Sequence, residues 1–452
     1  MTLKRWTMKP VKAVGLGAAL LATVAASAQQ PQPQMRASAP QPAQRTPDAA
    51  AAASLLPATK ALYDGYIAAG KMPGIVGAFG LGELPTVFVS AGKISLDPGA
   101  AAAGPDSLWR VYSMTKPITG MAAMLLVEDG KLSLDDPLSK YFPAFAKMRV
   151  LTSPDTSLET RAAAKPITIR ELMTHTSGIG YQINAKGPLL KEYERLGLVP
   201  ATVNAQIEAQ ARRTRPASLT AFAERVAQAP LVAEPGTTWH YSMGLDVLAA
   251  VVEKASGMSF ERFVQTRLLD PLKMNSTYWQ VPQRDVGRFA TNYAFVEEKL
   301  TPLDPAARSP WLQPPSFPYG GAGLVSSARD YDRFLHMLQN YGMLEGTRVM
   351  KEQTARLAMS NLMPAGVFFD NDGQQRGFGA GGVVYLNDDP NGASKGSYGW
   401  AGAAGTLALV DPAKRFRSTI MVNYFPAEKW PLGKETYAAI RRDAARLHGG
   451  QW

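Results

Sequence analysis

The chain has 452 residues, of which 46% are hydrophobic and 19% are charged, and it contains no cysteine. This apolar fraction is ample for a buried core, so the composition excludes a disordered or fibrous protein. Without cysteine there is no disulfide, no thiolate metal site and no cysteine nucleophile. A histidine-rich metal centre is also disfavoured, because the only histidines are His175, His240, His336 and His448.

The first 28 residues have the three parts of a secretory signal peptide. Residues 1–12 carry four basic side chains and no acid, an apolar stretch runs from Ala13 to Ala26, and Ala26-Ser27-Ala28 is an A-x-A cleavage site. The apolar stretch is shorter than the about 20 residues that a transmembrane helix needs. We therefore expect a periplasmic or secreted protein, cleaved after Ala28, with no stable membrane span.

The net charge gives no reason to expect a nucleic-acid partner. The formal charge of +11 falls to +7 when the four basic residues of the signal peptide are removed (11 − 4). The excess is spread along the chain, whereas nucleic-acid-binding proteins gather it into a patch or stripe. We expect a solvated basic surface; the sequence carries no signal for an oligomeric state.

The rest of the chain divides into a linker and a folded domain. Residues 29–53 are rich in Gln, Pro and Ala, a composition typical of a flexible linker. The domain is predicted to span residues 54–452, with a helical subdomain at about residues 130–330.

Short β-branched and aromatic runs predict strands at both ends of this domain. The early runs span 74–79 and 86–90, and the late runs span 382–386, 405–410 and 418–424. A turn sequence, Asp411-Pro412-Ala413-Lys414, separates the last two runs, so we expect them to form an antiparallel hairpin.

Between the strand runs the apolar pattern is mostly helical. One helical run ends at Gly130, and another, ending at Gly257, repeats Leu245, Leu248, Val251 and Val252 at helical spacing. Residues 331–338 and 434–447 also predict helices. Strands from both chain ends around a helical middle predict an α/β (α+β) fold, with one antiparallel sheet flanked by helices and an all-helical insertion.

Two serines match short hydrolase patterns in unsuitable contexts. Ser394 matches G-x-S-x-G, but that pattern requires a strand before it and a helix after it, and here a polar loop precedes it. Ser90-Ala91-Gly92-Lys93 matches S-x-x-K in a strand-like run, where residues three apart point to opposite faces. We expect neither serine to be a nucleophile.

Ser113-Met114-Thr115-Lys116 has the S-x-x-K spacing in a better context. It follows the strand-like run 108–112 and opens a helical run. Residues three apart on a helix share a face, so the Lys116 amine can approach the Ser113 hydroxyl and accept its proton. The free N–H groups of a helix N-terminus add partial positive charge near the serine. Spacing alone leaves two interpretations open, a Ser-Lys catalytic pair and a helix cap beside a solvated lysine.

The motif at Ser113 resembles the S-x-x-K motif of the serine β-lactamase and penicillin-binding protein superfamily. Four more stretches are similar to the class C β-lactamase-like branch, which includes the family VIII carboxylesterases, and they occur in the same order. The resemblance spans roughly residues 54–447. The stretches are 172–178 (LMTHTSG), 234–237 (EPGT), 239–248 (WHYSMGLDVL) and 320–326 (GGAGLVS).

The resemblance implies a β-lactamase/DD-peptidase-like fold and roles for particular residues. Ser113 would be the acylated nucleophile, Lys116 its proton acceptor, and Tyr241 the phenol that shares protons with the lysine and the leaving group. The N–H groups of Ser113 and Ala403 would form the oxyanion hole. No metal or organic cofactor is needed. By spacing alone, Tyr241 would be interpreted as a core aromatic beside Trp239.

The chain departs from class C β-lactamases at two motifs. Tyr241-Ser242-Met243 stands in place of Tyr-x-Asn, and the Lys-Thr-Gly motif is best matched by Trp400-Ala401-Gly402. A tryptophan offers an apolar wall and one N–H but no charge to pair with a β-lactam carboxylate. This departure resembles the family VIII carboxylesterases and related acyltransferases. The residues expected to contact substrate are Tyr112, Trp400, Ala401 and Gly402.

We therefore expect a carboxylesterase that hydrolyses short-chain, neutral, small-molecule esters through a Ser113–Lys116–Tyr241 acyl-enzyme mechanism. Three alternatives stay open. They are a β-lactamase or D-alanyl carboxypeptidase or aminopeptidase acting on cell-wall-like substrates, for which Lys395 could supply a cation; an acyltransferase; and a silent binding protein. The histidines are expected to be structural, and the insertion at about residues 180–230 has no readable specificity code.

Overall fold

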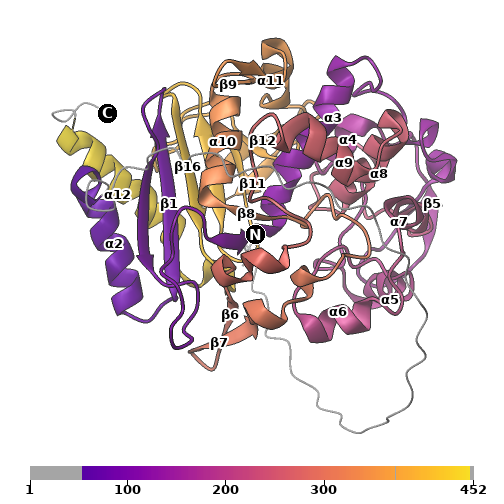
Figure 1. Cartoon of the computed structure of the whole chain (residues 1–452). Coiled ribbons are helices and arrows are strands. Elements are labelled where there is room, and N and C mark those ends of the chain that lie inside the picture. Colours follow the sequence, from indigo (N-terminus) through magenta and orange to yellow (C-terminus); the bar gives the residue numbers. More distant parts are fainter. Residues whose placement is uncertain (1–52, 372, 448–452) are drawn as a thin grey trace, which may run out of the picture. The chain divides into compact units, whose positions relative to one another are not determined.

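The computed structural model describes residues 53–371 and 373–447, so the predicted signal peptide and its cleavage site lie outside the described residues. The described residues belong to one compact unit, Ala49–Trp452. Its centre is an eight-stranded sheet with the order β11-β12-β13-β14-β15-β16-β1-β2, in which strands from both ends of the chain lie side by side (Figure 1). The strands are β1 (Gly74–Leu81), β2 (Val87–Gly92), β11 (Phe369–Asn371), β12 (Gln374–Phe378), β13 (Val383–Tyr385), β14 (Tyr398–Ala401), β15 (Leu407–Asp411) and β16 (Phe416–Met421).

All neighbouring strands of this sheet are antiparallel. The predicted late hairpin is confirmed, since β15 pairs with β16. Both faces of β1 are buried. Ile75 and Phe79 face one hydrophobic cluster, whereas Val76 and Ala78, which alternate with them, face a larger one.

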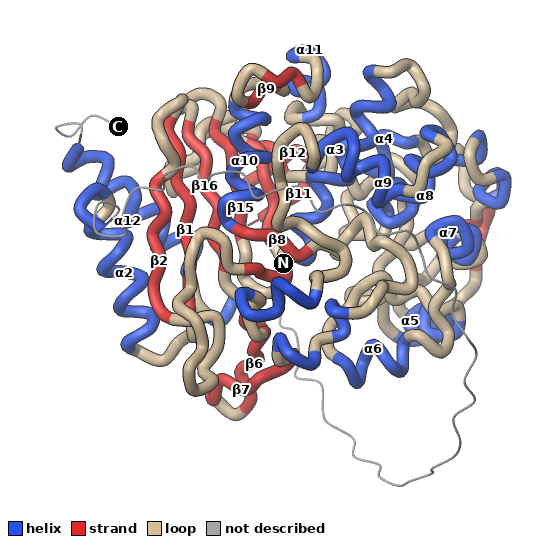
Figure 2. The backbone as a smooth tube through the Cα atoms, in the orientation of Figure 1, coloured by secondary structure: helices blue, strands red, loops and turns tan. Residues whose placement is uncertain are grey.

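Helices cover both faces of the sheet, which confirms the predicted fold class (Figure 2). On one side, α2 (Pro57–Ala68) packs beside α12 (Leu432–Leu447), and both contribute to the smaller of the two clusters. On the other side, α10 (Ala328–Gln339) lies against β1, β15 and β16. The predicted helices at 331–338 and 434–447 are therefore confirmed as α10 and α12.

The helical part of the unit is built around α3 (Thr115–Glu128) and α8 (Gly244–Ser256), which pack against each other. The apolar stripe of α8 is wholly buried, and the helix ends as predicted at Gly257, which has a left-handed backbone. The shorter helices are α4 (Ile169–Met173), α5 (Gly187–Arg195), α6 (Ala205–Ala211), α7 (Leu219–Val226), α9 (Phe260–Val264) and α11 (Glu352–Ala358).

The prediction of an all-helical insertion at about residues 130–330 needs correction, because two of the small ladders outside the main sheet, at residues 149–162 and 292–304, lie within it. The second is the hairpin of β6 (Asn292–Val296) and β7 (Lys299–Asp304), which turns through Glu297 and Glu298, both of which have positive φ. Such a turn normally uses Asn or Gly, so its sequence gave no indication of a hairpin. The pairs are β3 (Leu108–Arg110) with β8 (Val325–Ser327), β4 (Arg149–Leu151) with β5 (Thr160–Ala162), β6 (Asn292–Val296) with β7 (Lys299–Asp304) and with the parallel strand β17 (Tyr424–Phe425), and β9 (Met343–Leu344) with β10 (Thr347–Arg348).

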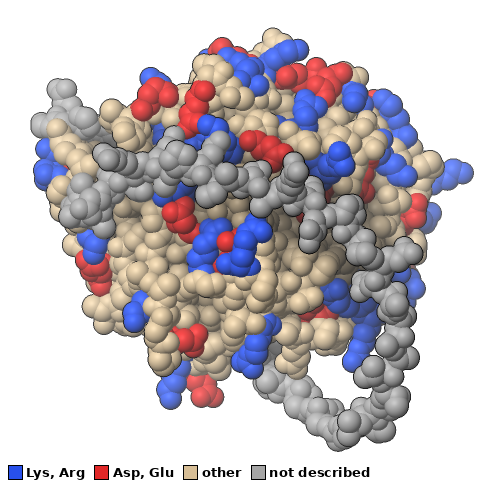
Figure 3. Space-filling model, in the orientation of Figure 1, with Lys and Arg blue, Asp and Glu red and all other residues tan. Residues whose placement is uncertain are grey.

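The surface carries charges of both signs. On the face seen in Figure 3, Lys and Arg side chains are interspersed with Asp and Glu side chains. Among the described residues, no helix is both long enough and apolar enough to cross a bilayer.

A buried arginine anchors the strand that leads to the S-x-x-K motif. Arg110, the last residue of β3, is 0% exposed, and its guanidinium forms an ion pair with Asp304 at 2.6 Å. The same side chain donates hydrogen bonds to the carbonyl oxygen of Ala290 and the hydroxyl of Ser309. Asn423 binds both the N–H and the carbonyl of Arg110. The end of β3 is thereby fixed to segments far away in the sequence.

Replacing Asp304 by Asn is expected to destabilise the protein strongly, because the Arg110 charge would stay buried without its counter-ion. Breaking a buried ion pair in this way costs about 3–5 kcal/mol. Urea unfolding measures the loss. The matched control is Asp64→Asn, which breaks a solvent-exposed pair with Lys60 and should change the unfolding free energy by less than about 1 kcal/mol. Equal effects of the two substitutions would contradict the anchoring role of Arg110.

Candidate active site

Ser113 lies in a tight turn between a strand and a helix. The chain leaves β3 at Arg110, passes through the 3-10 turn Tyr112–Met114 and enters α3 at Thr115. Tyr112 has φ of 43°, a left-handed conformation that is uncommon for a residue with a side chain and is often found at functional sites. The N–H of Ser113 falls in the first turn, where backbone N–H groups have no intrahelical acceptor.

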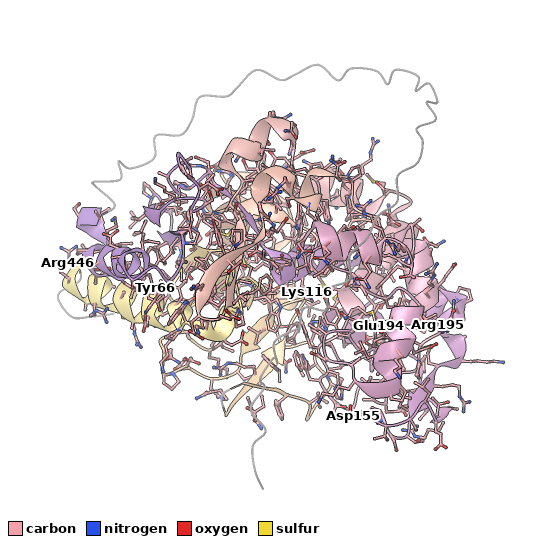
Figure 4. The ribbon with its side chains drawn as sticks, turned by 90° about the horizontal axis from the view of Figure 1, so that it is seen from below. Tyr66, Lys116, Asp155, Glu194, Arg195 and Arg446 are labelled. Carbon is pink, nitrogen blue, oxygen red and sulfur yellow. The ribbon has the colours of Figure 1, made fainter. Side chains whose placement is uncertain are left out.

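Lys116 reaches Ser113 from the interior of the protein. Its side chain is 0% exposed, and its Nζ lies 3.3 Å from the Ser113 Oγ. The same Nζ donates a 2.7 Å hydrogen bond to the carbonyl oxygen of Gly321, and the ring centres of Tyr241 and Tyr181 lie 4.8 and 5.7 Å from it. This burial excludes the alternative of a solvated lysine. Figure 4 shows Lys116 where the sheet and the helical part meet.

Tyr241 brings the third polar group to the same oxygen. Its hydroxyl donates a 2.7 Å hydrogen bond to Ser113 Oγ, although the two residues are 128 positions apart. Tyr241 lies in the loop before α8, and its ring is half-buried. The structure therefore brings together the three residues that the sequence predicted, with Ser113 Oγ between the amine and the phenol.

The stretch 172–178 holds the Tyr241 loop in place. The His175 carbonyl oxygen accepts a 2.8 Å hydrogen bond from the His240 N–H. The Nδ1 atom of the His175 ring accepts a 3.2 Å hydrogen bond from the Ser242 N–H. Burial and the nearby Lys116 charge hold the pKa of His175 well below its usual value, so the ring is neutral at pH 7. We assign its proton to Nε2 because Nδ1 accepts. His175 thus has the structural role expected for it, and His240 lines a cavity beside Tyr241.

Asp246 and Gly321 are site residues that the sequence did not single out. Asp246 Oδ1 accepts the Gly321 N–H at 2.8 Å, while the Gly321 carbonyl accepts Lys116 Nζ, so the backbone of one residue links the carboxyl to the amine. A Cβ at Gly321 would lie 2.5 Å from Asp246 Oδ2, so only glycine fits there. The sequence does contain a signal for Asp246, because it is the single acid inside the apolar run 244–252 and acids are almost never fully buried unless they are paired.

A wall of aromatic rings, formed by Trp239, Phe378 and Trp400, borders the Tyr241 ring. The ring of Trp400 on β14 lies 5.8 Å from that of Tyr241 and 5.0 Å from that of Phe378, and Trp239 stacks on Tyr241 at 6.0 Å. Within the described residues, the buried indole nitrogens of Trp239 and Trp400 have no hydrogen-bond partner. The wall is therefore apolar and uncharged, with two N–H groups still unsatisfied.

The turn after β14 packs closely against the Ser113 turn. A Cβ at Gly402 would lie 2.4 Å from the Val111 carbonyl oxygen, so glycine permits this approach. The next residue, Ala403, is exposed and occupies the tight turn closed by the hydrogen bond from the Gly405 N–H to the Gly402 carbonyl. Ala401 is also exposed. This arrangement puts the turn that contains Ala403 next to the segment that leads into the Ser113 turn.

Other sequence-predicted residues lie away from the site. Tyr112 is only 3% exposed, packs against Trp311 and Phe425, and so has no surface for substrate, which corrects the expected contact. Lys395 lies before β14, in a turn closed by the hydrogen bond from the Ser397 N–H to the Ser394 carbonyl, whereas Trp400 lies within β14. Ser394 lies in the same loop, where its N–H binds Asp411. Ser90 lies within β2.

The carboxyl of Asp246 predicts a pH-dependent stability that Asp246→Asn should remove. Burial raises its pKa from 3.8 to about 7, against the opposing charge of Lys116. Between about pH 4 and pH 7 the folded state keeps a proton that the unfolded state has lost, so this group lowers the unfolding free energy as the pH rises. Urea unfolding across this range should show the wild type losing stability relative to Asp246→Asn. A difference between the two that is constant with pH would contradict the buried, protonated carboxyl.

Comparisons with known proteins show the family to which the chain belongs. The β-lactamase family model matches residues 59–441. Esterase EstB of Burkholderia gladioli is 30% identical over 340 residues, which cover 70% of this chain and 78% of EstB. Lovastatin esterase of Penicillium rubens is 29% identical over 330 residues, 68% of this chain and 77% of that protein.

A solved structure supports the fold assignment. It is that of EstCE1, described as a hydrolase with promiscuous acyltransferase activity, which superimposes with a TM-score of 0.69 at 23% identity and covers 86% of this chain and 99% of its own. Because its identity is low, this likeness bears on the fold alone. Taken with the family match and the related esterases, it leads to one conclusion: the chain belongs to the β-lactamase family and is a serine hydrolase.

Proposed function

We propose that this serine hydrolase is a carboxylesterase that acts on neutral esters with short acyl chains. The observation that carries the proposal is the position of Ser113 Oγ, which lies within hydrogen-bonding reach of Tyr241 and 3.3 Å from Lys116 Nζ, beside an uncharged aromatic wall. A nucleophilic serine needs a proton acceptor in contact, and the pair supplies one.

The first half-reaction forms an ester bond to Ser113 and breaks the bond to the alcohol, and the second forms a bond to water and breaks the bond to Ser113. Ser113 Oγ attacks the ester carbonyl carbon as its proton passes to the Lys116–Tyr241 pair. The resulting oxyanion is held by the N–H groups of Ser113 and Ala403. The C–O bond to the alcohol then breaks as Tyr241 returns the proton to the leaving oxygen. Water repeats the sequence on the acyl-enzyme; an alcohol in its place would make the reaction an acyl transfer.

The aromatic wall favours a neutral acyl group. Trp239 and Trp400, which pack on the buried Phe378 ring, present carbon surface, and the wall carries no charge to neutralise a carboxylate. Lys395 is exposed in the turn before β14 and is not part of the aromatic wall, so we do not expect it to replace the missing cation. Relatives named as esterases support the same choice over a β-lactamase. We further propose that the enzyme works outside the cytoplasm, on the basis of residues 1–28.

Ser113→Ala is expected to lower hydrolysis of p-nitrophenyl butyrate by at least about 10³-fold, because the nucleophile is lost. It should also abolish covalent labelling by a fluorophosphonate. Ser394→Ala is the matched control, since Ser394 lies in a surface loop far along the chain. Turnover that survives Ser113→Ala, or is lost with Ser394→Ala, would reject the assigned nucleophile.

Trp400→Lys is expected to raise the ratio of kcat/KM for nitrocefin, an anion, to kcat/KM for p-nitrophenyl butyrate by about tenfold. The new ammonium would pair with the β-lactam carboxylate, and a charged hydrogen bond contributes about 1.5–3 kcal/mol. Trp400→Met is the control, because it removes the ring without adding charge. The proposal of a neutral substrate is contradicted if the unmodified enzyme already prefers nitrocefin.

A further inference from the structure

A cavity of about 450 Å³ is lined by Tyr241, whose ring also contacts the aromatic wall. It is enclosed by the loop 153–156, the segment 180–189 and residues 240–241. In Figure 4, Asp155 of the first loop lies toward the outer edge of the helical part, and Lys116 lies further inside. The cavity therefore extends from the catalytic tyrosine outward to the surface.

The two loops that shape this cavity are held close together. Gly187 has φ of 53°, and a Cβ on it would lie 2.6 Å from the carbonyl oxygen of Asp155. The amide of Asn184 reaches the carbonyl of Tyr241 at 3.5 Å. The cavity is thus bounded by segments in mutual contact, and ligand sites are usually preformed in this way.

Tyr241 connects the cavity to one particular part of the ester. The group that protonates a leaving oxygen must lie within hydrogen-bonding distance of it. In the mechanism proposed above, that group is the Tyr241 hydroxyl, so the alcohol part of the ester must pass beside the Tyr241 ring. The cavity that this ring lines is the space available there.

The lining of the cavity combines aromatic faces with hydrogen-bonding groups of both kinds. Tyr181 and Tyr241, whose ring centres are 5.4 Å apart, form the inner wall. The opposite charges of the lining residues Asp155 and Lys186 cancel. Burial lowers the pKa of His240, so this ring is neutral at pH 7 and offers one donor and one acceptor. The remaining polar lining residues are Ser153, Thr156 and Asn184.

We propose that this cavity binds the alcohol part of the ester and that the alcohol is an uncharged polyol, such as a sugar ring. A sugar has apolar C–H faces that pack on tyrosine rings and hydroxyl groups that both donate and accept hydrogen bonds. An alkyl alcohol would fill the same space but leave the polar lining groups without partners, which costs binding energy. The inference rests on the esterase function proposed above.

The test compares two esters that differ in the hydroxyl groups and the ring oxygen of the alcohol part. 6-O-acetylglucose and cyclohexylmethyl acetate share the acyl group, a primary alcohol and a six-membered ring. We expect kcat/KM to be at least about tenfold higher for the sugar ester, the effect of about one net hydrogen bond. Equal rates, or a preference for the cyclohexyl ester, would overturn the inference.

Two substitutions test whether the preference for the sugar ester arises in this cavity. Thr156→Val and His240→Phe keep the side-chain size but remove hydrogen-bonding groups, and each should lower the ratio of the two kcat/KM values by about threefold or more. Thr347→Val, on the exposed and distant strand β10, is the matched control and should leave the ratio unchanged. A preference for the sugar ester that neither cavity substitution reduces would overturn the assignment of this cavity.

The result that would contradict the esterase proposal differs from the result that would contradict the polyol site. An enzyme that cleaves p-nitrophenyl acetate but shows no preference for the sugar ester keeps the esterase function and loses only the polyol site. An enzyme that cleaves neither these esters nor p-nitrophenyl acetate loses both.

Discussion

The structure depends on placing an amine inside the protein, against a serine hydroxyl. Lys116 has no solvent exposure, and its contacts are the Gly321 carbonyl, Ser113 Oγ and two tyrosine rings. A buried amine without partners would be strongly disfavoured. Each partner is therefore both a stabilising contact and a constraint on where the amine can point. The same contacts that make the burial tolerable aim Nζ at Ser113 Oγ, the proposed nucleophile.

Distant parts of the chain supply these partners, which explains why the fold is needed for the chemistry. The segment 320–324 runs along the first turn of α3, where Thr119 donates to the Gly320 carbonyl and the Leu324 N–H donates to Thr115. The Tyr241 loop is held by the backbone of His175. The end of β14 reaches the Ser113 turn through Gly402. Arg110 and Asn423 fix the strand before the turn. The position of Ser113 Oγ relative to Lys116 and Tyr241 therefore depends on contacts from most of the domain.

The sequence predicted the elements whose patterns are local. The apolar stripe of α8, the turn at Asp411-Pro412 and the S-x-x-K spacing each lie within a few residues, and the structure has the helix, the hairpin and the Ser113–Lys116 contact that they indicate. The place of Tyr241 came from a resemblance, because no pattern relates residues 128 positions apart.

What the sequence did not predict depends on tertiary contacts. The Gly321 carbonyl that binds Lys116 is a backbone group, so the residue type at this position does not indicate that contact. Tyr112 was expected to contact substrate, but it has a left-handed backbone and its side chain packs in a buried aromatic cluster. The β6–β7 turn uses two glutamates that do not favour such a turn locally. The cavity beside Tyr241 is enclosed by loops whose sequences carry no specificity pattern.

The most direct test of the account is to locate the acyl group during turnover. The enzyme is mixed with p-nitrophenyl butyrate, quenched in acid within the first turnovers and digested, and the butyrylated peptide is identified by mass spectrometry. The account predicts that the butyryl group is on Ser113, in wild-type enzyme and, because deacylation uses the same phenol, in larger amount on any Tyr241→Phe enzyme that still acylates. A butyryl group on another residue, or steady ester hydrolysis with no acylated peptide in either enzyme, would contradict it.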